Sequence, residues 1–164
     1  MKIKIIKGVK VKKLYAFKDF RGKYIETFNI ENFPKIKFLQ DDLSYSKKNI
    51  LRGFHGDSKT WKLFTCVYGK VQFAAINFDK KSKDFKNNFT TILSDKNNLQ
   101  ILVPPKYGVA HLVLSKNAVL GYKQSTLYGK VKQFTINYKS PCLNFKWKSK
   151  KIRVSKRDSG GLCL

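Results

Sequence analysis

Several residue types are scarce in this 164-residue chain, and each scarcity excludes a class of protein. The three cysteines, Cys66, Cys142 and Cys163, include no C-x-x-C pair, which excludes a disulfide framework or zinc site and indicates free thiols in a reducing compartment. No apolar run approaches the roughly 18 residues of a transmembrane helix. Residues 1–13 alternate Lys with Ile and Val and lack a signal-peptide core. We therefore expect a cytoplasmic protein.

Acidic residues are also scarce, because ten Asp and Glu oppose 35 Lys and Arg and leave a net charge of +25. Such an excess favours nucleic acid or an anionic membrane as a partner. However, the lysines are spread along the whole chain, and arginines, which bind phosphate in a bidentate fashion, are few. Abundant Lys and Asn are also typical of AT-rich coding sequence. We expect an anionic small-molecule substrate, with no nucleic acid and no membrane as partner.

Helical patterns are absent as well. No segment has an apolar stripe at helical spacing, whereas turn residues recur about every 8 to 12 residues. This pattern predicts an all-β sandwich or jelly roll, in a single domain that covers residues 1–164. Residues 30–34 are expected to form a short turn or helical segment.

Two strand pairs are predicted from the turns between them. The strands 63–68 and 71–78 flank Gly69-Lys70, which predicts a hairpin. A second antiparallel pair is predicted for residues 110–114 and 118–126, around a short polar turn.

The stretch from Leu51 to Leu63 gathers the residues most suited to chemistry. A short strand carries Arg52 and His55 to its end, and the next strand begins with Lys62. These groups offer an anion anchor, a base and a cation within one cleft. A lone histidine is more often a satisfied core residue, but the glycines on either side of His55 allow a ligand to approach the backbone.

A metal site is not expected. The only histidines, His55 and His111, lie far apart in the sequence, and neither belongs to the H-x-H pair that metal-binding jelly rolls of the cupin type often use. Two separate imidazoles with scattered carboxylates make a poor transition-metal site.

Motifs spread along nearly the whole chain carry a resemblance to one enzyme family. In chain order they are 19–26 (D-x-R-G-x-x-x-E), 38–44 (F-x-Q-x-N-x-S, with Asp for Asn), 51–55 (L-R-G-x-H), 62–69 (K-L-v-x-x-x-x-G), 103–111 (i-P-x-G-x-A-H, with an insertion), 122–123 (Y-K), and 147 with 154–158 (W-p and l-S-x-k-D).

These motifs resemble those of the dTDP-4-dehydrorhamnose 3,5-epimerase family, the nucleotide-4-keto-sugar epimerases. The resemblance implies a cupin-type jelly roll, also called a double-stranded β-helix, with short helical turns. It implies an isomerase without cofactor that acts on a nucleotide-sugar substrate, and a homodimer. The 4-keto group of such a substrate acidifies the C–H bonds at C3 and C5. A base removes one proton, and a proton returns on the opposite face.

The resemblance also assigns catalytic roles. His55 is the base, and Asp158 orients its ring and supports the imidazolium. Lys62 stabilises the enolate oxygen, and Tyr122 is the acid that delivers the new proton. General acid–base catalysis by such groups typically contributes about 10² to 10⁴-fold.

Further positions match residues that line the substrate or contact its nucleotide diphosphate. These are Arg21, Glu26, Gln40, Asp42, Arg52 and His111. Asp42 stands where the family usually has Asn. The stretch from His55 to Thr60 resembles the branch that acts on GDP-4-keto-heptoses for surface polysaccharides such as capsule or lipopolysaccharide, so GDP and dTDP sugars are both candidate substrates.

Two other functions are compatible with these residues. A 3,4-ketoisomerase on the same fold would also use a histidine base, but would move the proton between carbons through an enediol. A non-catalytic basic jelly roll that binds polyanions would bind nucleic acid in a salt-dependent way and would not need His55 for this binding.

Overall fold

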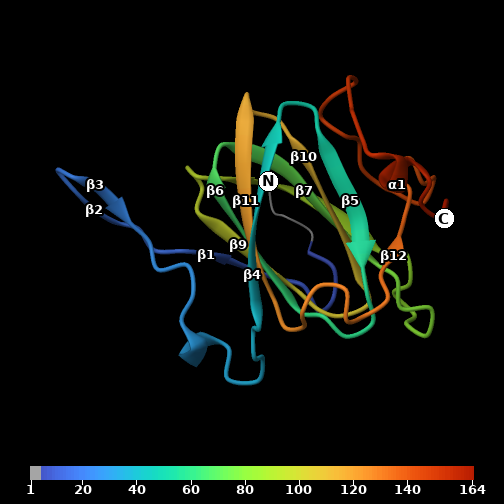
Figure 1. Ribbon diagram of the computed structural model, residues 1–164, viewed down its shortest axis with the longest axis horizontal. Helices are drawn as coiled ribbons and strands as arrows, with labels where there is room; N and C mark the ends of the chain where they lie inside the picture. Colours follow the sequence, from blue (N-terminus) through green and yellow to red (C-terminus); the bar gives the residue numbers. More distant parts are fainter. Residues whose placement is uncertain (1–4) are drawn as a thin grey trace.

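Two five-stranded antiparallel sheets face each other in the computed structural model, which describes residues 5–164 (Figure 1). The first four residues of the predicted N-terminal segment 1–13 lie outside the described residues. The first sheet has the order β1 (Lys10–Lys13), β9 (Leu99–Val103), β6 (Lys62–Tyr68), β11 (Asn117–Gln124) and β4 (Gln40–Lys47). The second sheet has the order β12 (Phe134–Thr135), β5 (Leu51–Gly56), β10 (Tyr107–Val113), β7 (Lys70–Asn77) and β8 (Asn88–Ser94).

From β4 to β12, successive strands cross from one sheet to the other, except for β7 and β8, which are neighbours in the second sheet. This is the arrangement of a jelly roll. The predicted all-β jelly roll is therefore confirmed. The helical content is small: η1 (Ile30–Asn32) is a 3-10 turn at the predicted place, and α1 (Lys156–Ser159) is a single α-helical turn near the C-terminus. Among the described residues, no helix is long and apolar enough to cross a membrane.

Both predicted strand pairs are wrong. β6 belongs to the first sheet and β7 to the second, and β11 and β10 are divided between the sheets in the same way. Gly69 has a φ of 78°, and a Cβ at this position would lie 2.3 Å from the Asn117 backbone oxygen, so the chain turns there against β11. Crossing between sheets lets both strands bury their apolar faces in one core, and a turn motif alone does not distinguish this from a hairpin.

The second sheet is buried on both faces. Its inner face packs against the first sheet, with the rings of Phe64 and Phe73 5.1 Å apart. Its outer face, which includes Phe54 and Ala74, is covered by the C-terminal segment, whose Trp147 ring lies 6.0 Å from that of Phe54. Burial on both faces explains why β7 has a nearly continuous apolar sequence.

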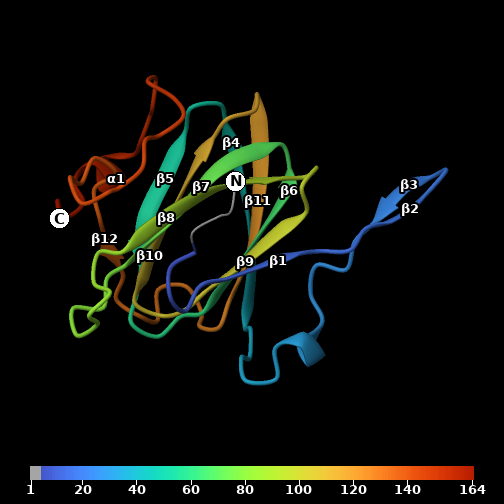
Figure 2. The ribbon, with the colours of Figure 1, turned by 180° about the vertical axis from the view of Figure 1, so that it is seen from behind.

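A small hairpin projects away from the two sheets. It consists of β2 (Phe17–Asp19) and β3 (Gly22–Tyr24), which pair only with each other (Figures 1 and 2). Its tip residue, Phe20, is 97% exposed. We call residues 15–26 the N-terminal arm.

The close approach of β5, β10 and β12 leads to a test of the fold. A Cβ on Gly56 would lie 2.3 Å from the Tyr107 backbone oxygen and 2.4 Å from Cζ of Phe134. We expect Gly56→Ala to lower the free energy of unfolding by about 3 kcal/mol, because the clash forces the strands apart. Urea unfolding followed by circular dichroism measures this change. An unaltered midpoint would contradict the packing described here.

Candidate active site

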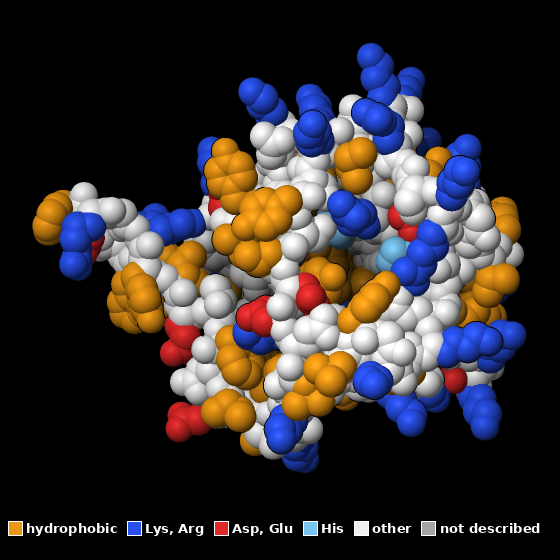
Figure 3. Space-filling view, viewed as in Figure 1, with side chains coloured by type: hydrophobic (Ala, Val, Ile, Leu, Met, Phe, Trp, Pro, Cys, Tyr) orange, Lys and Arg blue, Asp and Glu red, His pale blue; other side chains and the backbone are white. Residues whose placement is uncertain are grey.

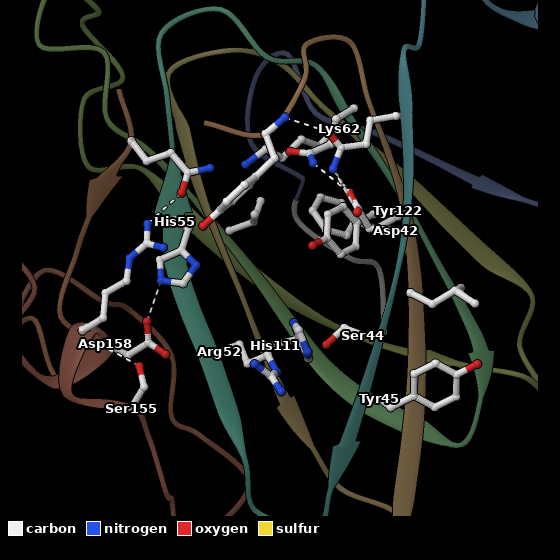
Figure 4. A pocket seen from close by; sticks show the side chains of 18 residues that line it. Asp42, Ser44, Tyr45, Arg52, His55, Lys62, His111, Tyr122, Ser155 and Asp158 are labelled. Carbon is white, nitrogen blue, oxygen red and sulfur yellow. Dashed lines mark hydrogen bonds and ion pairs between the residues drawn. The ribbon is translucent and has the colours of Figure 1, made fainter. Parts of the chain in front are cut away.

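A cavity of about 720 Å³ opens between the two sheets. Both histidines are visible in the hollow in Figure 3, with blue Lys or Arg side chains beside them. Its lining residues come from β4, β5, β6, β10 and β11, from residues 128–133 and from the start of α1 (Figure 4). Segments far apart in the sequence therefore meet around one space.

An irregularity in β5 places two of its side chains in the cavity. Arg52 and His55 are three residues apart, so a regular strand would direct them to opposite faces. However, β10 pairs Val109 with His55 and His111 with Arg52, and the register shifts between these pairs. The resulting bulge turns both Arg52 and His55 toward the cavity.

His55 is joined to the C-terminal segment by a short contact. Its Nε2 lies 2.5 Å from Oδ1 of Asp158, which is buried in α1. Ser155 caps α1, and its hydroxyl accepts the Asp158 N–H. Burial raises the pKa of Asp158, but its hydrogen bonds with His55 and Ser155 and the nearby imidazole charge bring the pKa below the ordinary value. An ionised carboxylate only accepts hydrogen bonds, so Nε2 of His55 carries the proton and Nδ1 is the free basic atom.

Lys62 begins β6 and is only 7% exposed. Burial lowers the pKa of its ammonium group, and the Arg157 charge lowers it further, while the Asp57 carboxylate opposes the shift. Asp57 itself forms the turn after β5, where its Oδ1 accepts the backbone N–H groups of Lys59 and Thr60. β5 thus ends at Gly56, and the turn returns the chain to the cavity at Lys62, where the next strand begins as predicted.

Tyr122 lies across the cavity from His55, on β11 of the first sheet (Figure 4). Its ring packs against Phe64, with 5.4 Å between the ring centroids. Burial raises the pKa of the phenol, and the Asp42 carboxylate raises it further. The phenol is therefore protonated at neutral pH and suited to donate a proton.

Two buried polar atoms face the cavity without a partner among the described residues. They are Oγ of Ser44 and Nε2 of His111. Burial, together with the charge of Arg52, lowers the pKa of His111 to about 4, so this imidazole is neutral at neutral pH. An unpaired buried polar atom costs free energy, typically about 1–3 kcal/mol. The pair is therefore suited to bind a polar ligand group.

The structure brings most of the predicted site residues together. Eight of them line this one cavity: Gln40, Asp42, Arg52, His55, Lys62, His111, Tyr122 and Asp158. Arg21 and Glu26 do not line it. Arg21 lies at the turn of the N-terminal arm, where its side chain is 76% exposed and pairs with Asp19, and Glu26 is exposed nearby. The substrate-binding role of these two residues stays a prediction.

Sequence reasoning missed several lining residues. They are Ser44, Gln124, Tyr128, Gln133 and Arg157. Alternation along β4 was a usable signal for Ser44, because Gln40, Asp42 and Ser44 share one face. Tyr128 resembled ordinary strand packing in the sequence, yet it lies in a loop and is 63% exposed. No local pattern marks Gln133, whereas Arg157 stands at the basic position of the motif at 154–158 and was not assigned a role there. Among residues 5–164, no three His, Cys, Asp or Glu side chains are grouped as metal ligands.

Known proteins match this chain over most of its length. The family model for dTDP-4-dehydrorhamnose 3,5-epimerase matches residues 4–164. An enzyme of that name from Shigella flexneri is 31% identical over 154 residues, which cover 89% of this chain and 85% of the relative. The Escherichia coli enzyme is 31% identical over 157 residues, covering 91% of this chain and 80% of the relative. A crystal structure of the Legionella pneumophila dTDP-6-deoxy-D-glucose-3,5-epimerase in complex with dTDP-4-keto-L-rhamnose superimposes with a TM-score of 0.91, at 28% identity, and covers 96% of this chain and 88% of that one.

The low pKa of His111 makes the stability of the protein depend on pH. In the unfolded chain this histidine titrates near 6.5, whereas in the native state its pKa is about 4. Between these values only the unfolded state binds the proton, so the free energy of unfolding should fall as the pH drops from about 6.5 to about 4, by about 3 kcal/mol in total. Urea unfolding at pH 7 and pH 4.5 measures this loss.

The control for this measurement is His111→Asn, which removes the titrating group. Asp158 and other carboxylates cause a loss of stability in acid in both proteins. The wild type should lose more stability than the variant over this pH range, and equal losses would contradict a buried neutral His111.

Proposed function

The chain belongs to the dTDP-4-dehydrorhamnose 3,5-epimerase family, and from this premise we propose that it inverts a nucleotide-diphosphate 4-keto sugar at C3, C5 or both. It is an isomerase of the nucleotide-sugar epimerase type. The observation that carries the proposal is the position of base and acid: His55 projects from the second sheet and Tyr122 from the first, on opposite walls of one cavity.

The reaction begins at His55. Nδ1 removes the proton from C3 or C5, next to the keto group, and the resulting imidazolium is stabilised by the ionised Asp158 at its Nε2. The negative charge moves to the keto oxygen as the enolate forms. Asp158 also holds the ring in one orientation, so the basic atom stays directed at the sugar.

Lys62 and Tyr122 complete the cycle. Lys62 is held in a buried position, where its positive charge stabilises the enolate oxygen more strongly than it would in water. Tyr122 then returns a proton from the wall opposite the base, which inverts the carbon. A 3,4-ketoisomerase instead needs the proton returned to the neighbouring carbon. The opposed walls therefore favour the epimerase, and the polyanion-binding alternative does not require a His55 that is paired with a buried Asp158.

The substrate is proposed to be a dTDP-4-keto-6-deoxyhexose or a GDP-4-keto-heptose, from which sugars for a surface polysaccharide are made. The Legionella relative was crystallised with dTDP-4-keto-L-rhamnose, which supports a dTDP sugar. The resemblance of residues 55–60 to the heptose branch supports a GDP sugar. The cytoplasmic location remains a prediction from the sequence.

We also propose that the protein is a homodimer in which the N-terminal arm of one copy reaches the cavity of the other. Arg21 and Glu26 match substrate-contacting positions of the family, yet in a single chain they lie outside the cavity. The arm also carries exposed aromatic residues, among them Tyr15 and Phe20. A second copy would cover these rings and bring both charged residues to the substrate.

Proton exchange in D₂O tests the reaction. With dTDP-4-keto-6-deoxyglucose or GDP-4-keto-heptose, we expect the wild type to remove the H3 or H5 signal from the proton NMR spectrum. His55→Asn should slow this exchange by about 10² to 10⁴-fold, because it removes the base. Lys62→Gln should also slow exchange, and Lys59→Gln serves as its control because Lys59 is exposed three residues earlier. Full exchange in the His55 variant, or none with the wild type on either substrate, would refute the proposed function.

Mixing two inactive variants tests the homodimer and its arm. One variant is His55→Asn and the other is Arg21→Ala. If Arg21 enters the partner's cavity, each mixed dimer contains one intact site, and random exchange should restore about a quarter of wild-type activity. If Arg21 serves its own cavity, or if light scattering shows a monomer, no activity should return.

A further inference from the structure

Asp42 is a carboxylate that the reaction described above does not use. The cavity has to accept a substrate with a negatively charged diphosphate, yet it contains two carboxylates in a protein that has only ten acidic residues. Asp158 is paired with His55. Asp42 forms no ion pair among the described residues, and in the family this position is usually Asn, a neutral side chain of the same shape.

Two glutamine amides hold Asp42 in place. Nε2 of Gln40 lies 2.9 Å from each carboxylate oxygen, and Nε2 of Gln124 lies 2.8 Å from Oδ2. A carboxylate only accepts hydrogen bonds, so both amides must present their NH₂ groups to it. The arrangement fixes the side chain as an acceptor that faces the cavity.

The carboxylate has unused capacity on one oxygen. A carboxylate offers about four acceptor sites, two on each oxygen. Oδ2 accepts from both amides, whereas Oδ1 accepts from Gln40 alone. One acceptor site on Oδ1 is therefore open to a ligand that donates a hydrogen bond.

The position of Asp42 decides which part of the substrate it meets. Asp42 and Tyr122 are direct partners in the pairing of β4 with β11, so their Cβ atoms lie about 5 Å apart. The sugar carbon that Tyr122 protonates must lie beside this pair. A diphosphate is repelled by the carboxylate and is attracted instead to the cations that line the cavity on other elements, Arg52 of β5 and Arg157 of α1.

We propose that Asp42 is a specificity residue that accepts a hydrogen bond from a hydroxyl of the substrate sugar, next to the carbon protonated by Tyr122. The substrate class is then a 4-keto sugar that keeps a hydroxyl at this place, and an analogue deoxygenated there is bound less well. This inference rests on the proposed function, because it requires a nucleotide sugar in the cavity.

Calorimetric titration of non-reacting ligands tests the contact independently of turnover. The ligands are dTDP and GDP alone, then dTDP-glucose and GDP-mannose. Asp42→Asn removes the charge and keeps the shape of the side chain. We expect it to weaken binding of the sugar nucleotides by about tenfold to a hundredfold, because a hydrogen bond to a charged group is lost. Binding of dTDP or GDP alone should be unchanged or tighter.

Asp41→Asn is the matched control. Asp41 lies on the same strand, but its side chain is 63% exposed and pairs with Lys123 at 2.5 Å, outside the cavity. The variant has the same net charge as Asp42→Asn and should bind every ligand as the wild type does. Thermal unfolding of both variants verifies that they are folded, and an equal loss of affinity in both would show that the effect does not arise from a contact of Asp42 and would overturn the proposal.

The remaining outcomes also decide the matter. In the dTDP-glucose series, one of the 2-, 3- and 6-deoxy analogues should bind the wild type and Asp42→Asn equally, which identifies the hydroxyl. An equal loss for dTDP and dTDP-glucose would place the contact on the nucleotide, and unchanged or tighter binding of all ligands would show that Asp42 contacts none of them; either result overturns the proposal. If the wild type binds no nucleotide or nucleotide sugar at all, the proposed function is refuted, and the inference about Asp42, which depends on that function, is refuted as well.

Discussion

The site depends on the burial of the outer face of the second sheet by the C-terminal segment. Trp147 packs against Phe54 there, and its indole N–H donates to the Tyr138 backbone oxygen. This cover directs the chain around the sheet edge to α1, where Asp158 meets His55 from 103 positions away in the sequence. Apolar packing on one side of β5 thus positions the His55–Asp158 pair on the other side. A substitution that loosens the cover would also loosen the orientation of the His55 ring.

The distribution of charge in the cavity affects both the attraction and the orientation of a ligand. The protein has a net charge of +25, so its overall electrostatic field already attracts an anionic nucleotide sugar. The charge of the lining side chains also differs from place to place in the cavity. His111 is neutral and lies near Arg52, Lys62 is a buried cation, and the carboxylate of Asp42 is held by two amides. This uneven distribution of charge orients a ligand, because the anionic and the hydroxyl-bearing parts of the ligand are attracted to different side chains.

Much of the fold and of the site could be predicted from the sequence. The absence of helical periodicity and the regular turns indicate an all-β chain, and His55 near the end of β5 and Lys62 at the start of β6 lie as expected. The partners of the strands around Gly69 and around residues 115–117 could not be predicted, because a turn motif is the same whether the next strand joins the same sheet or the opposite one. The bulge in β5 could not be predicted from the sequence either, because it arises from the register of β10 against β5.

The order of residues specifies which side chains are available: a histidine between two glycines, a lysine seven residues later, and motifs shared along the chain with one epimerase family. Their arrangement in space follows from the packing of the two sheets. The tertiary structure set Tyr122 opposite His55, placed Asp42 beside Tyr122, brought in Arg157, and kept Arg21 and Glu26 outside the cavity. The physical reason is that residue identity and local periodicity are properties of the chain, whereas opposition across a cavity depends on which sheet each strand enters.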